Sequence, residues 1–455
     1  MIYMEKQQNN FLKSIQYIPV ISKYTFYHTF KTWYQFLKKS REWNEKQIQN
    51  YQNHQLKSLI NHAFHHVPYY HKLFQSKNLK PKDITQLSDM DKIPVLTKDI
   101  IMENISLLKA KNYPENSFHI RNTGGTTGTP LSFYIEKAKW LGIHFAFNKI
   151  YMQKAGYHWY DKVISISGIK NPMKHHSLYR TLELSSFHTT SKDFEKYNRQ
   201  IHRFKPRFIT AFPSALLLFT KDMVTQKKNI YTGFQAIFCH GEILHPMQKK
   251  YFEDIYNCKV FDQYGHREQC VFATTCKQSN LYHIFPEYGI VEILNKQNQP
   301  MKSDNKTGEI VATSLLNYVF PFIRYKTNDL AEISNETCDC GSSYHLLKRI
   351  IGRTQEFLIG KNHEKIPLTG LYHILTKQSF HIRECQILQE KEGELIISYV
   401  KSEHYSKKDK EKIQQAFYDT IGKQFTLIFQ PVDSIKRTKD GKYQYLIQKL
   451  PIKFF

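Results

Sequence analysis

The spacing of apolar residues along the chain predicts helices that alternate with strands. Apolar positions between Leu56 and Phe64 recur at intervals of three and four residues, which predicts a helix that ends at Val67, before Pro68. Runs rich in β-branched and aromatic residues predict strands over 118–121, 131–136, 162–168, 207–212, 236–244 and 259–265. Further helices are predicted over 138–152 and 245–256. Alternating strands and helices favour an α/β body.

The pattern changes character after residue 287. Three apolar runs joined by short polar turns predict a β-rich subdomain, with strands over 288–295, 308–315 and 329–334. Beyond residue 355 the pattern predicts a helix, two strands, a helix and a strand, over 370–378, 382–390, 394–400, 407–422 and 425–432. We therefore expect two domains: a multi-subdomain α/β body over 1–354 and a small, mobile α+β domain over 355–455.

The segment 11–40 mixes aromatic and aliphatic residues with lysines and allows two interpretations. It forms either one or two helices that pack on the body, or an amphipathic segment that touches a membrane surface. Pro19 interrupts the pattern and the apolar period is irregular, which favours the packed helices.

Composition narrows the choice of partners only slightly. The 455 residues are 41% hydrophobic and 23% charged, which is typical of a folded chain. The formal charge of +25 favours anionic partners such as nucleotides, polyphosphates, nucleic acid or an anionic membrane. An AT-rich genome raises the share of lysine by itself, so the charge is weak evidence. The sequence contains no recognised nucleic-acid module, which argues against nucleic acid as the partner.

Apolar runs and cysteines bear on the compartment. No apolar run reaches the ~18 residues of a membrane span, and the first residues lack an apolar stretch followed by a small-residue cleavage site. We therefore expect a cytoplasmic protein. Seven cysteines, an odd number in a long chain, argue against a disulfide framework and favour buried, reactive or metal-binding thiols.

The stretch RNTGGTTGTPLSF, residues 121–133, is the clearest candidate for ligand binding. Glycine lets backbone N–H groups approach a ligand closely, and threonine adds hydroxyl donors, so such a loop can surround phosphate oxygens. It lacks the Gly-Lys-Ser/Thr of a Walker loop and lies between two predicted strands rather than before a helix. A plain hairpin is the alternative, although a hairpin needs only two special residues.

Four further motifs follow this loop along the chain. They are QYGHREQ at 263–269, IRYKTNDLAEI at 323–333, RIIGRTQEF at 349–357 and RTKDGKYQYLI at 437–447. In this order the five motifs resemble those of the adenylate-forming superfamily, which contains acyl-CoA ligases and peptide-synthetase adenylation domains. Together with the segment 54–74, they are similar to the phenylacetate–CoA ligase branch, and especially to its capsular-polysaccharide (CapK-like) members. The resemblance covers nearly the whole chain.

The resemblance implies a nucleotide site. The loop residues that would surround the β- and γ-phosphates of ATP are Thr123, Gly124, Gly125, Thr126, Thr127 and Gly128. Gly241 and Glu242 would lie along adenine. Tyr264 and Gly265 would flank adenine and the α-phosphate.

The resemblance also implies the residues that act on the reacting groups. Glu268 would hold Mg²⁺, Asp329 would accept hydrogen bonds from the ribose hydroxyls, and Arg353 would contact ribose or phosphate. Lys442 would be the catalytic lysine that reaches the α-phosphate and the attacking carboxylate, and Gln355 would be the hinge. These residue types suit the chemistry, because a carboxylate that attacks an α-phosphate brings two anions together and cations must offset their repulsion.

Four departures from the family pattern stand beside these matches. Thr129 replaces a common lysine and Arg267 a common threonine. Asn328 replaces a common glycine and Gln355 a common hinge aspartate. A degraded, non-catalytic paralogue is therefore an alternative. Against it stand four functional residues that are present as a set: Glu268, Asp329, Arg353 and Lys442.

Three cysteines and one histidine form a second candidate site. Cys276 and His283 form C-x6-H, and Cys338 and Cys340 form C-x-C at a glycine turn. Thiolates with one imidazole suit tetrahedral Zn²⁺, and four protein ligands make such a site structural. Some members of the resembled branch carry a structural metal in this region. We predict a structural Zn²⁺, with unrelated reduced cysteines as the alternative and Cys270 as a spare ligand.

Together the motifs predict an enzyme that uses ATP and Mg²⁺ to activate a carboxylic acid as an acyl-adenylate. The acyl group would then pass to coenzyme A, or to an amine or hydroxyl of a sugar in surface-polysaccharide synthesis. The alternatives are a non-catalytic basic protein that binds an anionic polymer, and an adenylyltransferase that stops at the adenylated product. Candidates for the acyl pocket are Trp140, His144, Phe145 and the segment 211–214, which leave aryl, amino and uronic acids open.

Overall fold

The computed structural model of the chain describes most of its residues. They are 20–122, 131–137, 139–169, 171–176, 180–188, 190–301, 303–353, 357–362, 364–367, 371, 374, 381–438 and 443–450. The side chains at 20–24, 353, 365 and 367 are outside this description. The predicted phosphate loop 123–128, the hinge Gln355 and the catalytic Lys442 lie outside the described residues.

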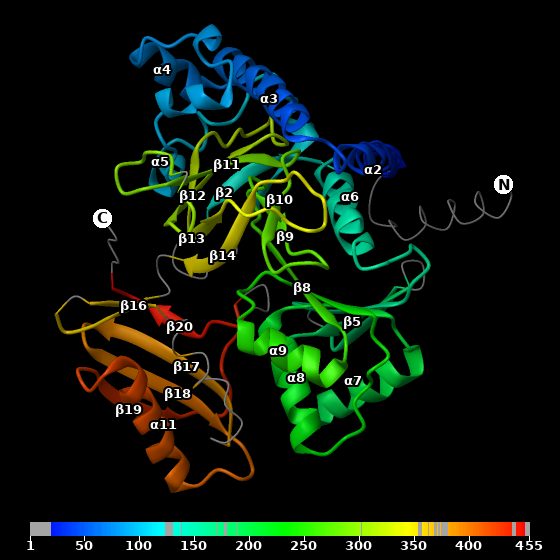
Figure 1. Ribbon diagram of the computed structural model, residues 1–455, viewed down its shortest axis with the longest axis vertical. Coiled ribbons are helices and arrows are strands. Elements are labelled where there is room, and N and C mark those ends of the chain that lie inside the picture. Colours follow the sequence, from blue (N-terminus) through cyan, green and yellow to red (C-terminus); the bar gives the residue numbers. More distant parts are fainter. Residues whose placement is uncertain are drawn as a thin grey trace, which may run out of the picture.

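Within the described residues, one sheet of twelve strands runs through the body of the molecule, in the order β11-β12-β13-β14-β10-β9-β8-β7-β6-β3-β5-β4 (Figure 1). Its parallel strands are β3 (Val163–Ser167), β5 (Thr181–Ser185), β6 (Phe208–Ala211), β7 (Ala236–His240) and β8 (Lys259–Gly265). Its antiparallel strands are β4 (Met173–His176), β9 (Phe272–Thr274), β10 (Tyr282–Ile284), β11 (Gly289–Leu294), β12 (Thr307–Ser314), β13 (Tyr325–Ser334) and β14 (Leu346–Arg353).

Strand β8 is the junction between the two parts of the sheet. It runs parallel to β7 and antiparallel to β9. The predicted α/β body is confirmed, and the strands of the predicted β-rich subdomain are hydrogen-bonded into the same sheet. Ligands of α/β proteins commonly bind beyond the carboxyl ends of parallel strands, where the strand order changes. The end of β8, from which the QYGHREQ motif continues, is such a position.

Helices cover both faces of the parallel strands. They are α6 (Lys139–Gln153), α7 (Ser191–Phe204), α8 (Pro213–Thr225) and α9 (Pro246–Tyr256). On one face Ile209 and Ile237 pack with Leu216 of α8 and Phe252 of α9. On the other, Phe238 packs in the cluster that contains residues of α6. Burial on both faces explains why these strands are continuous apolar runs rather than alternating patterns.

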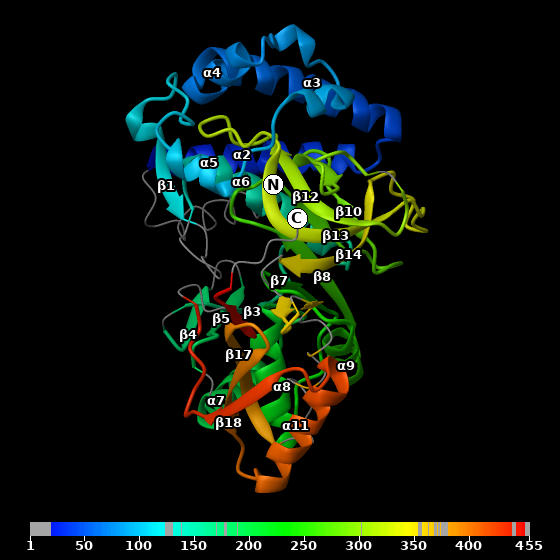
Figure 2. The same cartoon turned by 90° about the vertical axis from the view of Figure 1, so that its left-hand side faces the viewer.

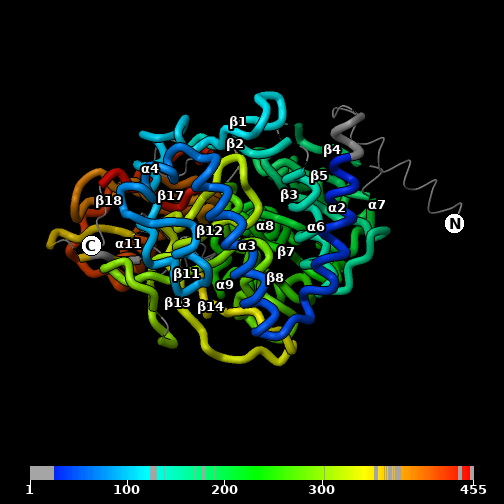
Figure 3. The backbone as a smooth tube through the Cα atoms, turned by 90° about the horizontal axis from the view of Figure 1, so that it is seen from above, coloured from blue at the N-terminus to red at the C-terminus, as the bar shows by residue number. Residues whose placement is uncertain are grey.

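The N-terminal segment forms a helix that packs on the body. Helix α2 (Val20–Ser40) lies along α6, and Phe26 and Leu37 are buried. A Cβ at Gly142 of α6 would stand 2.8 Å from the carbonyl oxygen of Phe26, so only glycine permits this approach. For residues 20–40 the structure therefore agrees with the packed-helix interpretation (Figure 3).

Helix α3 (Glu45–His66) begins earlier than the apolar pattern indicates. The side chain of Asn44 accepts a hydrogen bond from the Gln47 N–H, and the Gln47 side chain accepts one from the Asn44 N–H. This capping box starts the helix in a polar stretch that carries no apolar period. The predicted end at Val67 is correct, and a new helix, α4 (Pro68–Ser76), begins with the proline at its first position.

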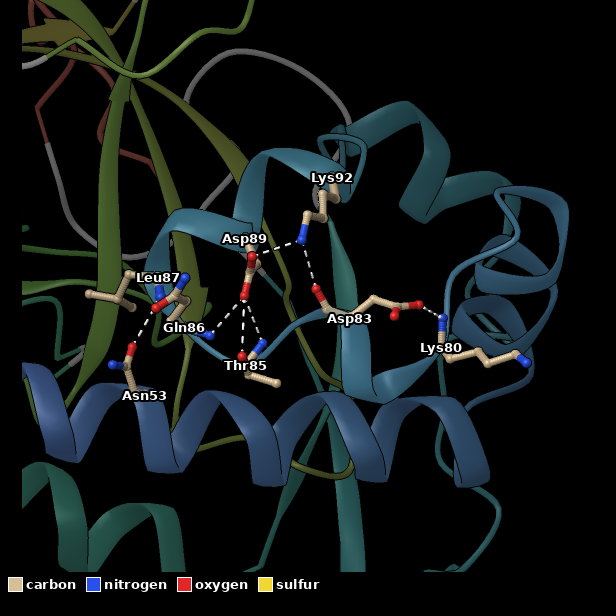
Figure 4. Close-up of polar contacts among 8 residues, drawn as sticks. All are labelled: Asn53, Lys80, Asp83, Thr85, Gln86, Leu87, Asp89 and Lys92. Carbon is tan, nitrogen blue, oxygen red and sulfur yellow. Dashed lines mark hydrogen bonds and ion pairs between the residues drawn. The ribbon is translucent and has the colours of Figure 1, made fainter.

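A compact turn segment links these helices to the sheet (Figure 4). It contains the 3₁₀ turns η1 (Pro81–Asp83) and η2 (Leu87–Lys92), and η3 (Glu115–Ser117) and α5 (Lys98–Glu103) follow later in the chain. Asn53 of α3 accepts a hydrogen bond from the Leu87 N–H at 3.0 Å. Asp89 accepts from the N–H groups of Thr85 and Gln86 and from Lys92. These bonds fix the segment that leads into the sheet.

The strands that flank the glycine–threonine loop form a hairpin, as predicted. Strand β1 (Phe118–Asn122) pairs antiparallel with β2 (Ser132–Glu136), with Asn122 opposite Ser132. The hairpin therefore holds the two ends of the loop side by side.

The C-terminal lobe, residues 357–450 as described, has its own sheet and core. Its strands are β15 (Phe357–Ile359), β16 (Lys365–Pro367), β17 (Ile382–Lys391), β18 (Glu394–Lys401), β19 (Thr426–Pro431) and β20 (Leu446–Gln448), with helix α11 (Lys407–Ile421). The order β19-β18-β17-β20 and the packing of Ile413 and Phe417 against the sheet confirm the small α+β fold. Most of the predicted helix 370–378 lies outside the described residues. The boundary between 354 and 355 stays a prediction.

The lobe lies beside the half of the body that contains α8 and α9 (Figures 1 and 2). One predicted strand is shorter than expected in this half. The run 236–244 predicts a strand to Leu244, but β7 ends at His240 because Gly241 takes a φ of +77° and turns the chain. No helix among the described residues is both long and apolar enough to cross a membrane.

Candidate active site

Strands β8 and β13 bring together two residues predicted to bind the nucleotide. The hydroxyl of Tyr264 donates a hydrogen bond to Oδ2 of Asp329 at 2.7 Å. The N–H of Asp329 donates to Oγ1 of Thr327 at 3.1 Å, and the carboxylate is buried, with 8% of the residue exposed. A carboxylate held in this way is a preorganised acceptor for a pair of hydroxyls.

Asn328 explains how one departure from the family pattern is tolerated. Its φ is +61°, in the left-handed region where glycine is the common residue. Asparagine adopts this region more readily than other side chains. The turn before Asp329 therefore keeps its shape without glycine.

Arg353 lies opposite Asp329 in the sheet. The two residues are paired in the antiparallel register of β13 and β14. The backbone thus places both predicted ribose-binding residues at one end of neighbouring strands.

Glu268 lies just beyond β8, among neutral donors. The hydroxyl of Tyr325 donates a hydrogen bond to its Oε1 at 3.2 Å, and Nδ1 of His266 stands 3.3 Å from its Oε2. Burial and the nearby carboxylate raise the pKa of Tyr325, so this side chain remains a phenol and a donor. We call Tyr264, Glu268, Tyr325 and Asp329 the nucleotide wall.

The donor set around Glu268 fits Mg²⁺ that is shared with a substrate. Magnesium is commonly held by one or two carboxylates, with waters and substrate phosphates completing an octahedron. Glu268 supplies such a carboxylate, 8% exposed, and the predicted phosphate loop belongs to the hairpin on the same side. Sequence reasoning did not identify Tyr325, although it stands four residues before Asp329 in the same motif.

Arg267 connects the end of β8 to the root of the loop. Its Nη1 donates a hydrogen bond to the carbonyl oxygen of Asn122 at 3.0 Å, and Asn122 directly precedes Thr123. The arginine that replaces a common threonine therefore binds the hairpin that carries the phosphate loop.

Two of the predicted acyl-pocket residues lie together beside this hairpin. The guanidinium of Arg121 lies 4.1 Å from the Trp140 ring centroid, and that ring is 5.7 Å from His144. Burial, with a smaller effect of Arg121, lowers the pKa of His144 to about 4, so the imidazole is neutral. Phe145 instead packs edge-on against Phe26 of α2, with centroids 5.6 Å apart.

Glu242 lies at the boundary between the body and the lobe. Its Oε2 accepts from the Ser214 N–H at 3.0 Å, and its Oε1 accepts from the Ser214 hydroxyl at 2.9 Å. Oε1 also accepts from the Tyr443 N–H of the lobe at 2.8 Å. The sequence predicted a place along adenine for Gly241 and Glu242, and nothing in its spacing pointed to Ser214 or Tyr443.

The four predicted zinc ligands form one cluster, which we call the Cys/His cluster: Cys276, His283, Cys338 and Cys340. Their ligand atoms all lie within 4.8 Å of one another. The sulfurs of Cys276 and Cys338 are 3.5 Å apart, and Nε2 of His283 is 3.2 Å from the sulfur of Cys340.

The surroundings of the cluster prepare it for a metal. Nδ1 of His283 lies 3.2 Å from the carbonyl oxygen of Leu281, which leaves Nε2 to face the thiols. Burial lowers the pKa of His283 to about 4, so the ring is the neutral form that binds zinc. The N–H groups of Gln278 and Ser279 donate to the sulfur of Cys276, each at 3.3 Å.

Cys270 is not a member of the cluster. It is fully buried in the core, and its thiol donates to the carbonyl oxygen of Glu268. The four clustered residues provide one nitrogen and three sulfur ligands, which fits a closed tetrahedral zinc site.

Comparison with known proteins places these sites in a family. Residues 358–449 match the family model of the CapK C-terminal domain. The protein CapK of Staphylococcus aureus is 24% identical over 433 residues, covering 92% of this chain and 93% of CapK. The phenylacetate-coenzyme A ligase of Escherichia coli K12 is 25% identical over 330 residues, covering 69% of this chain and 72% of the ligase.

A solved structure extends the likeness to the fold. The crystal structure of 2-hydroxyisobutyryl-CoA ligase in the postadenylation state has a TM-score of 0.73 at 19% identity, covering 90% of this chain and 92% of the ligase. The chain belongs to the adenylate-forming superfamily. Within it, the chain stands with CapK and the phenylacetate–CoA ligases, as its motif order predicted.

Adenylate-forming proteins have been solved with their two parts in different arrangements, and this chain compares unequally with them. The same 2-hydroxyisobutyryl-CoA ligase in the thioesterification state gives a TM-score of 0.62, against 0.73 for the postadenylation state. Because the ligase is the same in both, the body and lobe of this chain are arranged more like those of the postadenylation state.

Proposed function

We propose that the chain uses ATP and Mg²⁺ to activate a carboxylic acid as an acyl-adenylate and then transfers the acyl group to an acceptor. The observation that carries the proposal is the nucleotide wall: Tyr264 bonded to a buried Asp329, with Glu268 held by Tyr325 one strand away. These groups come from three of the family motifs and meet at the carboxyl end of β8.

Each residue of the site has a task that its chemistry suits. Asp329, with one oxygen held by Tyr264, accepts hydrogen bonds from the ribose diol. The loop 123–128 donates backbone N–H groups to the β- and γ-phosphates. Lys442 offsets the repulsion between the attacking carboxylate and the α-phosphate. Glu268 would hold Mg²⁺, which neutralises charge on the departing pyrophosphate.

The acceptor in the second half-reaction is the thiol of coenzyme A or a sugar amine or hydroxyl. The phenylacetate-coenzyme A ligases and 2-hydroxyisobutyryl-CoA ligase are, by name, ligases of coenzyme A. The likeness to CapK covers nearly all of both chains and favours a role in surface-polysaccharide synthesis. We place the thiol first because both halves of the solved ligase fold are present here.

The lobe from residue 355 acts in this proposal as a lid that reorients between the two half-reactions, with its hinge near Gln355. The Cys/His cluster holds a structural Zn²⁺ within the body. Four protein ligands leave no open position, so this metal supports the fold and takes no part in the transfer.

A screen of ATP-dependent pyrophosphate exchange over a panel of aryl, amino and uronic acids tests the proposal. At least one acid should give exchange that requires Mg²⁺ and that Asp329→Ala abolishes. Product analysis then separates a ligase, which consumes the adenylate, from an adenylyltransferase that stops there. A protein that merely binds an anionic polymer would show steep salt dependence and no need for ATP.

A further inference from the structure

Glu242 joins the two parts of the molecule through one carboxylate. Three donors converge on it: the N–H and hydroxyl of Ser214 from the body and the N–H of Tyr443 from the lobe. The distances are 3.0, 2.9 and 2.8 Å. Hydrogen bonds from several donors to one charged acceptor are stronger than neutral ones and fix its geometry.

On the body side, the carboxylate is held at the start of α8. Ser214 is the second residue of this helix and is 4% exposed. The helix has no capping bond from the side chain that precedes it, so the carboxylate supplies the missing acceptor. The N-terminal end of a helix also favours negative charge. Glu242 is therefore fixed to the body before the lobe contributes anything.

On the lobe side, the partner residue is fixed by its own side chain. The hydroxyl of Tyr443 accepts from the Cys385 N–H at 2.9 Å and donates to the Cys385 carbonyl oxygen at 2.7 Å. The guanidinium of Arg437 lies 4.3 Å from the Tyr443 ring centroid. Arg437 is itself 3.0 Å from the carboxylate of Glu384, and both side chains are buried. Tyr443 therefore moves only with the lobe.

Two other polar contacts cross the same boundary, and both are longer. Nε2 of Gln248 donates to the Tyr445 hydroxyl at 3.4 Å, and Arg383 stands 3.6 Å from Asp222. The bond between Glu242 and Tyr443 is thus the shortest of these contacts and involves the main chain. Lys442 directly precedes Tyr443, and consecutive Cα atoms are only about 3.8 Å apart.

We propose that Glu242 is a positioning residue that seats the lysine-bearing segment for the first half-reaction. It acts through the Tyr443 N–H and need not touch the reacting atoms. The bond has to break when the lobe reorients for acyl transfer, so Glu242 favours adenylation over the second step. This inference rests on the proposed function of the site.

The bond can be tested without any substrate. Hydrogen–deuterium exchange of the peptide that spans residues 437–446 should be faster in Glu242→Ala than in the wild type, and intermediate in Glu242→Gln. The amide oxygen of glutamine can still accept one N–H, so this variant should restore part of the protection. Asp193→Ala is the matched control, because Asp193 accepts at the start of α7 from Thr190 within the body alone.

The two half-reactions test the consequence. In Glu242→Ala, kcat for pyrophosphate release should fall about 30-fold or more, because misplacing a catalytic group by about 1 Å costs up to ~10²-fold. Consumption of supplied acyl-adenylate and KM for ATP should stay within about threefold of the wild type. Asp193→Ala should leave both half-reactions within about twofold.

Each contrary outcome has its own meaning. A higher KM for ATP at unchanged kcat would make Glu242 an adenine contact and overturn the inference. Equal losses in both half-reactions would indicate a structural role and also overturn it. Unchanged exchange in Glu242→Ala would show that the bond itself is absent. A wild-type chain that releases no pyrophosphate would instead overturn the proposed function, while the exchange result still reports the bond.

Discussion

The Cys/His cluster and the nucleotide wall use neighbouring strands of one sheet, yet they depend on the rest of the molecule in different ways. The ligand atoms of the cluster lie within 4.8 Å of one another, and all four residues belong to the body. The nucleotide wall pairs Tyr264 with Asp329 and Glu268 with Tyr325, but its predicted partners are a hairpin loop and a lysine of the lobe. The cluster is closed, whereas the wall is open to two other parts of the chain.

This difference teaches what each site is built to do. A site that satisfies its own ligands within one rigid part contributes stability and needs no motion. A site completed by a second lobe can be assembled and taken apart during turnover. Changes at the wall should therefore affect chemistry more than stability, and changes at the cluster should do the reverse.

The largest effect should come from the lysine that the lobe contributes. Lys442→Ala should lower pyrophosphate release about 10³-fold, because a cation aimed at the reacting anions is lost. Thermal unfolding should be nearly unchanged. Lys449→Ala is the matched control, since this exposed lysine of the same lobe pairs only with Glu390. Persistent pyrophosphate release in Lys442→Ala would remove the lobe from the first half-reaction.

The next largest effect should follow from the buried carboxylate of the wall. Asp329→Ala should weaken ATP binding about 10- to 100-fold, because hydrogen bonds to a charged group contribute about 1.5–3 kcal/mol. Tyr264→Phe, which keeps the carboxylate and removes one bond, should weaken it less. Isothermal titration of both variants measures the difference. Equal losses would mean that Tyr264, and not Asp329, contacts the nucleotide.

At the cluster, loss of metal should appear before loss of activity. Replacing Cys338 and Cys340 together by Ser should reduce bound zinc from about one per chain to none and lower Tm by roughly 5 °C or more. Elemental analysis and calorimetry measure both. Cys258→Ser, outside the cluster, should leave the zinc content unchanged. Zinc retained by the double variant would show that the metal lies elsewhere or that the four residues do not bind it.

The smallest effect concerns a residue of β8 between the two sites. Burial raises the pKa of Asp262 to about 7, although Tyr282 and the Gln263 N–H donate to it. The folded chain therefore keeps a proton that the unfolded chain releases, so the free energy of unfolding should fall as pH rises from about 4 to about 7. Asp262→Asn should flatten this slope in urea titrations at several pH values. An unchanged slope would assign it to other groups.

Much of the fold could be predicted because local patterns agree with the tertiary structure. The parallel strands are buried on both faces and so read as continuous apolar runs, and α11 shows its apolar face in sequence. Short strands were missed. Strand β10 has three residues and β9 has three, too few to show a period, yet β10 carries His283 into the cluster.

Parts of the site could be predicted and parts could not. Tyr264 and Asp329 were identified from motifs, and the structure joins them by a hydrogen bond. Tyr325, which holds Glu268, was missed because an isolated tyrosine in an apolar run is read as core. Ser214 and Tyr443 were missed because their partner Glu242 is far away along the chain.

The sequence by itself determined the family, the order of the motifs, the chemical type of each candidate ligand and most of the helices and strands. These are local properties, set by residue identity and by the spacing of apolar positions. Only the tertiary structure decided which distant groups meet: Cys276 with Cys338, Tyr264 with Asp329, and Glu242 with Tyr443. Such contacts depend on strand order and on how the lobe lies against the body, and no local pattern encodes either.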